Sequence, residues 1–227
     1  MINTRELILG RLRAAAPAPS DSAEIDMRID QHYAQRRVQS AATDMAEALA
    51  EALTRAHATA WCASSEAWPQ QVAERLRADG VRKVLLDPNS SEGAALARAM
   101  APEVEAIGYD RPIEEWKSEL FHGVDAGFTV ARSGIAGAGA LVLAPDAGTP
   151  RTVSLVPPLH IALVYASTLF PDLHALARAE RWADGMPSNL VLVSGPSKTS
   201  DIQQTLAYGA HGPSRMWVVI IHDEVKA

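Results

Sequence analysis

The chain has 227 residues, a mass of 24.3 kDa and a formal net charge of −6, so non-specific binding to nucleic acid or acidic lipid has no electrostatic support. Its single cysteine, Cys62, cannot by itself form an internal disulfide, a four-cysteine zinc site or an iron–sulfur cluster. No apolar run approaches the roughly 20 residues of a membrane span, and no signal-peptide core follows the charged first residues, so we expect a cytoplasmic protein.

The first 57 residues are predicted to be helical. Apolar residues recur at helical spacing up to Leu12, and Pro17 and Pro19 end that helix. A longer helical pattern follows over residues 27–57, but its larger apolar side chains are too sparse for a deep core. We therefore expect residues 1–57 to form a helical arm that covers a sheet edge or pairs with another chain.

From residue 58 onward, short apolar runs alternate with helical patterns. Such alternation favours right-handed crossovers and a largely parallel sheet. We expect strands over residues 60–63, 82–86, 103–107 and 125–131, and helices over 66–78, 91–100 and 112–120.

The second half of the chain is richer in strands, and its short connections permit hairpins and an antiparallel part of the sheet. The predicted class is α/β: a central, mostly parallel mixed sheet flanked by helices, in a domain over residues 58–227. Strands are expected over 140–144, 152–156, 160–165, 189–193 (the clearest buried strand) and 216–221, and helices over 172–181 and 200–208.

A glycine-rich turn between two strands is the first candidate site. Gly134, Gly137 and Gly139 let backbone N–H groups approach a ligand closely, as anion sites require. Arg132 and Arg151 lie near strand ends beside this turn and could pair with a carboxylate or a phosphate. The alternatives are a tight connection packed under a neighbouring element, and solvated arginines.

The second candidate site is the loop between the strand 189–193 and the expected helix 200–208. Free N–H groups at a helix start attract anions, Lys198 adds a positive charge, and the loop follows a strand's carboxyl end, where open α/β sheets bind ligands. A helix capped by Thr199 or Ser200 is the alternative, and it is compatible with a ligand. The candidate ligand-binding residues here are Ser194, Gly195, Ser197, Lys198 and Thr199.

Two histidines are candidate acid–base residues. His211 lies in a Gly-Pro loop after Gly209, and His160 opens a strand. For each, the alternative is a hydrogen-bonded structural histidine. The other histidines show no metal-ligand spacing, so we expect no metal site, and Cys62 is interpreted as a small buried apolar residue.

Five sequence blocks of the second half are specific in combination. They are Gly127-Phe128-Thr129, residues 133–143, residues 154–161, residues 194–202 and Gly209-Ala210-His211-Gly212-Pro213. Together they resemble the LUD (lactate utilization) domain family.

The resemblance implies a fold similar to the glucosamine-6-phosphate deaminase, ribose-5-phosphate isomerase and CoA-transferase-like group. It also implies a system that oxidises L-lactate to pyruvate, in which this chain holds no cofactor and two partner proteins carry iron–sulfur clusters. The chain departs from the family at Ala138 and Ala140, where threonines are common, and at Lys198, where arginine is common.

Three functions remain open, and with them whether the chain is an enzyme. The first is a non-redox component of a lactate-oxidising complex that binds a small carboxylate or phosphate through the two candidate loops and His211. The second is a free-standing enzyme acting on a phosphorylated sugar, a folate or a CoA ester, and the third is a structural adaptor with a vestigial pocket. For partner contact, the arm and Trp61, Trp68 and Trp116 are candidates, with core packing as the alternative for the tryptophans.

Overall fold

The computed structural model of the protein describes residues 4–15, 22–40, 44–200 and 206–223. The chain divides into two units, Met1–Ala42 and Thr43–Ala227. Within the described residues, every helix is too short or too polar to cross a membrane.

The N-terminal unit contains two helices, α1 (Thr4–Ala14) and α2 (Ser22–Ser40). α1 buries none of its residues, and the side chain of Leu12 is 63% exposed. An isolated helix of this length is marginal in water.

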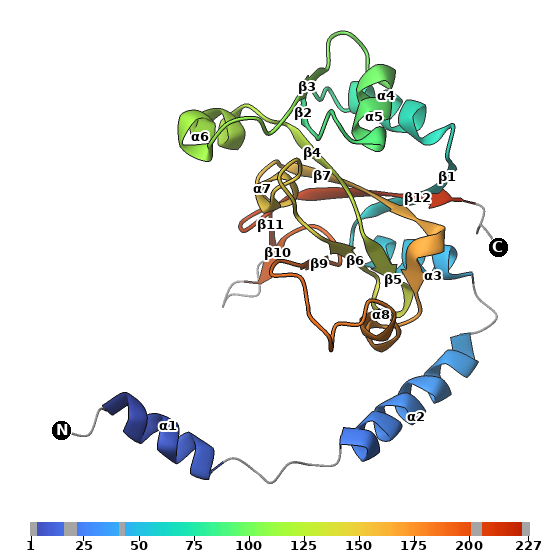
Figure 1. Cartoon of the computed structure of the whole chain (residues 1–227). Helices are drawn as coiled ribbons and strands as arrows, with labels where there is room; N and C mark the ends of the chain where they lie inside the picture. The colour runs from blue at the N-terminus through green and yellow to red at the C-terminus, as the bar shows by residue number, and fades with distance from the viewer. Residues whose placement is uncertain (1–3, 16–21, 41–43, 201–205, 224–227) are drawn as a thin grey trace. The chain divides into compact units, whose positions relative to one another are not determined.

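A six-stranded sheet with every neighbouring pair parallel forms the centre of the second unit (Figure 1). Its strand order is β1-β12-β7-β4-β2-β3, which confirms the predicted α/β class. The strands are β1 (Thr59–Ser64), β2 (Lys83–Leu85), β3 (Glu105–Ile107), β4 (Ala126–Val130), β7 (Leu159–Tyr165) and β12 (Arg215–His222).

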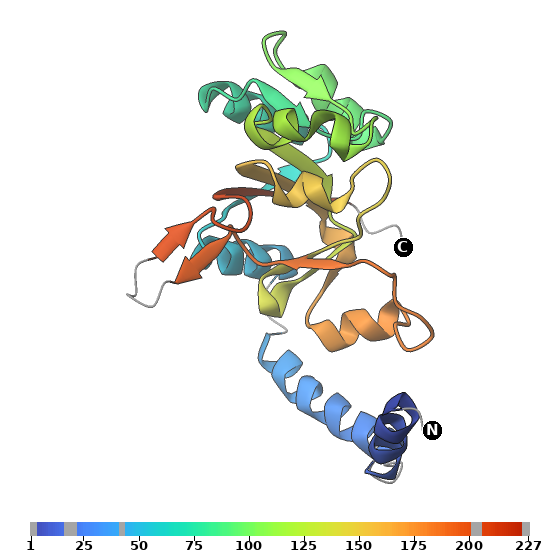
Figure 2. The same cartoon turned by 90° about the vertical axis from the view of Figure 1, so that its left-hand side faces the viewer.

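Apolar clusters fill both faces of this sheet, as expected for parallel strands covered on each side. On one face, Trp68 of α4 stacks on Phe128 with ring centroids 5.7 Å apart, so core packing accounts for this tryptophan. On the other face, which α3 and a second sheet cover (Figure 2), alternate residues of β7 and β12 pack against apolar side chains of these elements. The helices of this unit are α3 (Met45–Arg55), α4 (Trp68–Ala78), α5 (Ser91–Ala99), α6 (Ile113–His122), α7 (Arg151–Leu155) and α8 (Leu173–Ala179).

The second sheet has four strands in the order β8-β5-β6-β9. β5 and β6 are antiparallel, as are β6 and β9, so the expected antiparallel part of the structure exists as a separate sheet. Because β9 lies at its edge, Leu192 is 50% exposed, and the prediction that this is the clearest buried strand of the chain is wrong. Cys62 of β1 is also exposed, so the expectation of a buried apolar residue is wrong. The strands are β5 (Ser133–Ile135), β6 (Ala140–Leu143), β8 (Leu169–Phe170) and β9 (Val191–Val193).

Helix α3 belongs to the α/β unit, although the sequence placed it within the arm of residues 1–57. Leu49 and Leu53 are fully buried, and α3 packs against β1 and the short helix η1 (Ala136–Ala138). Its alanines allow this close approach, because a small side chain lets two backbones come near each other. Few large apolar residues therefore suffice to anchor the helix.

Two segments differ from the sequence-based prediction. Residues 151–155 form the helix α7 where a strand was expected over 152–156, and Pro150 precedes its first turn. The expected helix over 200–208 is wrong: β10 (Lys198–Ser200) and β11 (Leu206–Tyr208) are antiparallel strands, paired Lys198 with Tyr208. Residues 201–205 of that expected helix lie outside the described residues.

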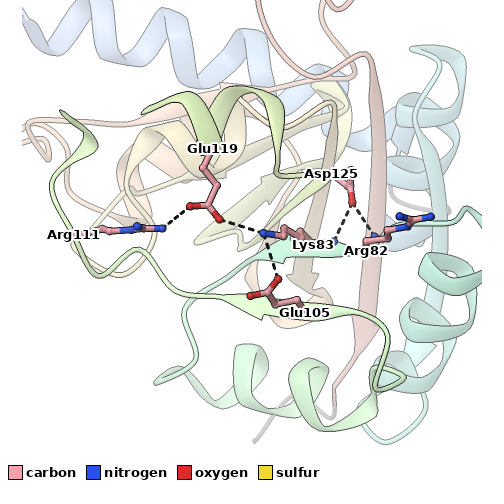
Figure 3. Close-up of polar contacts among 6 residues, drawn as sticks. All are labelled: Arg82, Lys83, Glu105, Arg111, Glu119 and Asp125. Atoms are coloured by element: carbon pink, nitrogen blue, oxygen red, sulfur yellow. Dashed lines mark hydrogen bonds and ion pairs between the residues drawn. The ribbon is translucent and has the colours of Figure 1, made fainter. Parts of the chain in front are cut away.

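An ion-pair network ties the amino ends of β2 and β3 to α6 (Figure 3). Lys83 Nζ lies 3.2 Å from Glu119 Oε1 and 3.4 Å from Glu105 Oε2, and Arg111 Nη2 lies 2.7 Å from Glu119 Oε2. Hydrogen bonds from Lys83 and Arg111 lower the pKa of Glu119, which keeps this carboxyl ionised. Asp125 accepts hydrogen bonds from the backbone N–H of Lys83 and of the preceding residue. The carboxylate of Asp125 therefore lies at the amino end of β2, close to these ion pairs.

Candidate functional site

The glycine turn packs against elements of its own chain. A Cβ on Gly134 would lie 2.5 Å from Leu169 Cδ2, and one on Gly139 would lie 2.6 Å from Ala52 Cβ in α3. The N–H of Gly137 donates to the carbonyl oxygen of Pro171 at 3.0 Å. The packed-connection interpretation accounts for these contacts, and ligand binding at this turn stays a prediction.

The two arginines near this turn have different surroundings. The Nε atom of Arg132 lies 3.1 Å from a carboxylate oxygen of the largely buried Glu180, just after α8. Arg132 therefore already has an anionic partner. Arg151 is exposed at the first residue of α7, rather than near the end of a strand.

The two other candidate loops meet in space. Ser197 donates its backbone N–H to the carbonyl oxygen of Pro213 at 2.8 Å, and Gly209 donates to the carbonyl oxygen of Ser197 at 3.0 Å. Thr199 Oγ1 lies 3.1 Å from His211 Nδ1, and the N–H of His211 donates to Ser197 Oγ at 3.3 Å. The residues Ser197, Lys198, Thr199 and His211 are called the loop cluster below.

Anion binding at this loop was predicted from free N–H groups at the start of a helix, and the described residues do not form that helix start. Residues 198–200 form a strand rather than the start of a helix, and the N–H of Ser197 is used by Pro213. A Cβ on Gly195, at φ 147°, would lie 2.8 Å from the carbonyl oxygen of Ala56, so this glycine packs on the end of α3. Ser194 and Lys198 are exposed, which leaves a cation, two hydroxyls and an imidazole as the chemistry of the loop cluster.

The loop cluster lies beside the amino ends of β7 and β12. Arg215 N and Ser214 Oγ both donate to the carbonyl oxygen of Pro158, which precedes β7, and Pro213 contacts Ser197 as described. Ligands of open parallel sheets bind at the carboxyl ends of the strands. The loop cluster follows β9 of the smaller mixed sheet and lies beside the amino ends of two parallel strands, so this tendency does not support it as a ligand site.

His160 and the exposed His211 have different hydrogen-bond partners, and only His160 is buried. It is 1% exposed, and its Nε2 lies 2.9 Å from Thr129 Oγ1. Burial lowers the pKa of His160 to about 4, so the ring is neutral at pH 7. A neutral, enclosed imidazole matches the alternative of a hydrogen-bonded structural histidine.

Sequence reasoning missed a small pocket at the carboxyl end of β4. Along the chain, β3 is added on one side of β2, whereas β4, β7 and β12 are then added in turn on its other side. The direction of the strand order therefore reverses between β2 and β4, and open α/β sheets bind ligands at such a point. The pocket has room for roughly one water molecule. It is lined by Thr129, Val130, Leu143, Ala144, Pro145, Thr149 and Ser154.

The sequence signal for this pocket was present but incomplete. Thr129 and Ser154 both lie in blocks that carry the family resemblance, and both are buried polar residues. Reading 152–156 as a strand concealed that Ser154 comes from a helix lying over β4. Among the described residues, no group of three or more His, Cys, Asp or Glu side chains is arranged to hold a metal ion.

Gly127 of β4 sets how closely α7 approaches the sheet. A Cβ at this position would overlap the carbonyl oxygen of Val153. We expect Gly127→Ala to lower the free energy of unfolding by about 1–3 kcal/mol, because α7 must move away from β4. Urea denaturation of both proteins measures the change, and equal midpoints would contradict this packing.

The fold and site define an α/β protein with a parallel six-stranded sheet, a small hydroxyl-lined pocket and an exposed polar loop cluster. The LUD domain family model matches residues 46–221, and the chain belongs to this family, as the resemblance predicted. The chain is also 36% identical to the uncharacterized protein NMB1437 of Neisseria meningitidis serogroup B, over 97% of this chain and 94% of that protein.

Relatives named lactate utilization protein C match a shorter part of the chain. The protein from Exiguobacterium sp. is 34% identical over 51% of this chain and 52% of its own length. The protein from Halalkalibacterium halodurans is 37% identical over 44% of this chain and 45% of its own length. The chain thus aligns with about half of each of these two relatives.

A solved structure shares the fold. The crystal structure of a DUF162 family protein from Deinococcus radiodurans superimposes with a TM-score of 0.56 at 19% identity, covering 78% of this chain and 96% of that one. This likeness supports the α/β architecture alone.

Proposed function

We propose that this chain is a non-redox component of a lactate-utilization system and acts with iron–sulfur partner proteins in the oxidation of L-lactate to pyruvate. Membership of the LUD domain family and the matches to relatives named lactate utilization protein C support this role. Its one cysteine supports the assignment of the clusters to partners, because cysteine thiolates are their usual ligands.

Within this role, the loop cluster is our candidate for contact with a small carboxylate or phosphate. The observation that carries this proposal is the direct contact of His211 with Thr199 and Ser197 across two loops. Lys198 lies between Ser197 and Thr199 in the chain and is exposed, and because successive side chains of a strand point to opposite faces, its ammonium is open to an anion on the face of β10 opposite Thr199. Charge-assisted hydrogen bonds from an ammonium are about twice as strong as neutral ones.

Lys198→Ala tests the anion contact. For the native protein, L-lactate or inorganic phosphate at about ten times the dissociation constant should add about 1.4 kcal/mol of stability, read as a rise in melting temperature. We expect Lys198→Ala to lose most of this rise, because the cation is gone. Lys117→Ala, which removes another exposed lysine on α6, is the matched control and should keep it.

A growth and co-purification experiment tests the wider role. Deleting the gene should abolish growth on L-lactate, and the tagged chain should co-purify with iron–sulfur proteins. If growth requires the chain while neither anion raises its melting temperature, the adaptor role gains, which the packed glycine turn also favours. Normal growth of the deletion strain on L-lactate would contradict the proposal as a whole.

A further inference from the structure

The pocket at the carboxyl end of β4 is bordered by three hydroxyl side chains, two of which are themselves buried. Thr129 is 5% exposed and Ser154 is 3% exposed, and Thr149, from the segment before α7, supplies the third hydroxyl. The other lining residues have apolar side chains: Val130, Leu143, Ala144 and Pro145. A molecule in this pocket therefore meets hydroxyl groups, and no side chain of the described lining carries a charge.

Two of the three hydroxyls have already used their proton. Ser154 Oγ donates to the carbonyl oxygen of Arg151 at 3.1 Å, and Thr149 Oγ1 donates to Asp146 Oδ1 at 3.0 Å. A hydroxyl has one proton and two lone pairs, so each of these groups can only accept a further hydrogen bond. The pocket therefore suits a molecule that donates protons, and it opposes a carboxylate group, which has only lone pairs to offer.

The third hydroxyl connects the pocket to a buried imidazole. Thr129 Oγ1 lies 2.9 Å from Nε2 of His160, which is 1% exposed. If Nε2 accepts this bond, Thr129 has only lone pairs left for the pocket, whereas if Nε2–H donates, Thr129 keeps its proton. A water molecule can bond to both Thr129 and Ser154 in either tautomer, because it has two protons and two lone pairs.

We propose that this pocket is a binding site for one ordered water molecule, which joins Thr129 of β4 to Ser154 of α7. The size of the pocket agrees, since it has room for roughly one water molecule. Buried waters typically form about three hydrogen bonds to protein groups, and Thr149 supplies a third partner. An ammonium ion also donates protons, but none of the described lining residues has a carboxylate to offset its charge.

The water lies where the strand order of the central sheet reverses, the point at which open α/β sheets bind ligands. In this chain the hydroxyls at that point select a small uncharged donor. The loop cluster, in contrast, offers the ammonium of Lys198, which selects an anion. The inference is therefore independent of the proposed role in lactate utilization, and the test of one site does not decide the other.

A high-resolution crystal structure of the full-length chain tests the site directly. We expect one ordered water at about 2.5–3.0 Å from both Thr129 Oγ1 and Ser154 Oγ. Thr129→Val keeps the shape of the side chain but removes its hydroxyl, so this water should be lost. Thr152→Val is the matched control and should keep the water, because Thr152 lies on α7 outside the lining and its buried Oγ1 has no partner among the described residues. Native crystals without this water, or an unchanged water in Thr129→Val, would overturn the proposal.

NMR spectroscopy of the native protein tests the site in solution without any substitution. A water that stays in the pocket should give a nuclear Overhauser effect at the methyl protons of Val130 and Leu143, which line it. Formate, the smallest carboxylate, should leave the amide signals of Thr129 and Ser154 unchanged when it is added. If the methyl groups show no contact with water, or if formate shifts both amide signals, the pocket is not the water site proposed.

Discussion

Leu49→Ala is expected to lower the free energy of unfolding of the full-length protein by about 2–5 kcal/mol. Leu49 is fully buried, and its Cδ2 lies against Gly134, so its side chain joins α3 to the second sheet. Removing it leaves a cavity between these elements that the packed backbone of β5 cannot fill. Urea denaturation followed by circular dichroism measures the loss.

The matched control is Leu12→Ala in α1. Leu12 is 63% exposed, so its truncation should change the free energy of unfolding of the α/β unit by no more than about 0.5 kcal/mol. If the two variants lose equal stability, α3 does not anchor the α/β unit in the way its burial indicates. The pair thus separates a helix that is part of the core from one that is not.

The central sheet could be predicted because its strands carry their own signal. The apolar run of β12 is bounded by Arg215 and His222, and that of β7 begins just after a pair of prolines. Parallel strands are buried on both faces, so their apolar runs are nearly continuous. The role of α3 was harder to read, because only two large side chains, Leu49 and Leu53, are buried on it and most of its other apolar residues are alanines, which also suit an exposed helix.

The segments predicted incorrectly depend on contacts that are distant in the chain. Val153 belongs to an apolar run typical of a strand, but Gly127 lets the helix α7 sit directly on β4. The segment of residues 200–208 contains two glutamines, one leucine and one alanine, which favour a helix, yet β10 and β11 pair as strands while Gly209 bonds to Ser197. Tertiary pairing overrode local helix propensity at this position.

The candidate site could be predicted as residue types but not as geometry. Ser197, Thr199 and His211 were singled out in two separate loops, and the structure joins them. That union depends on strand pairing and on the contact between Ser197 and Pro213, which no local pattern reveals. The pocket near Thr129 was missed for a similar reason, since four of its seven lining residues come from the segment leading into α7 and from α7 itself.

His160 should make the protein less stable as the pH falls from about 6.5 to about 4. Burial lowers the pKa of this ring from 6.5 to about 4, so in this window the unfolded chain binds a proton that the folded chain does not. Stability therefore rises with pH across the window, and its full value is present above about pH 6.5. The difference of about 2.5 pKa units corresponds to about 3 kcal/mol lost by pH 4.

Urea denaturation at several pH values between 4 and 7 measures this contribution. His160→Gln retains a polar group that can bond to Thr129 but does not titrate, so its stability should fall less steeply with acid than that of the native protein. His122→Gln, at an exposed histidine at the end of α6, should keep the native pH dependence. If His160→Gln shows the native slope, other groups cause the acid sensitivity. A ring that titrates near pH 6.5 in the folded protein, followed by its NMR signals, would contradict its enclosure beneath α7.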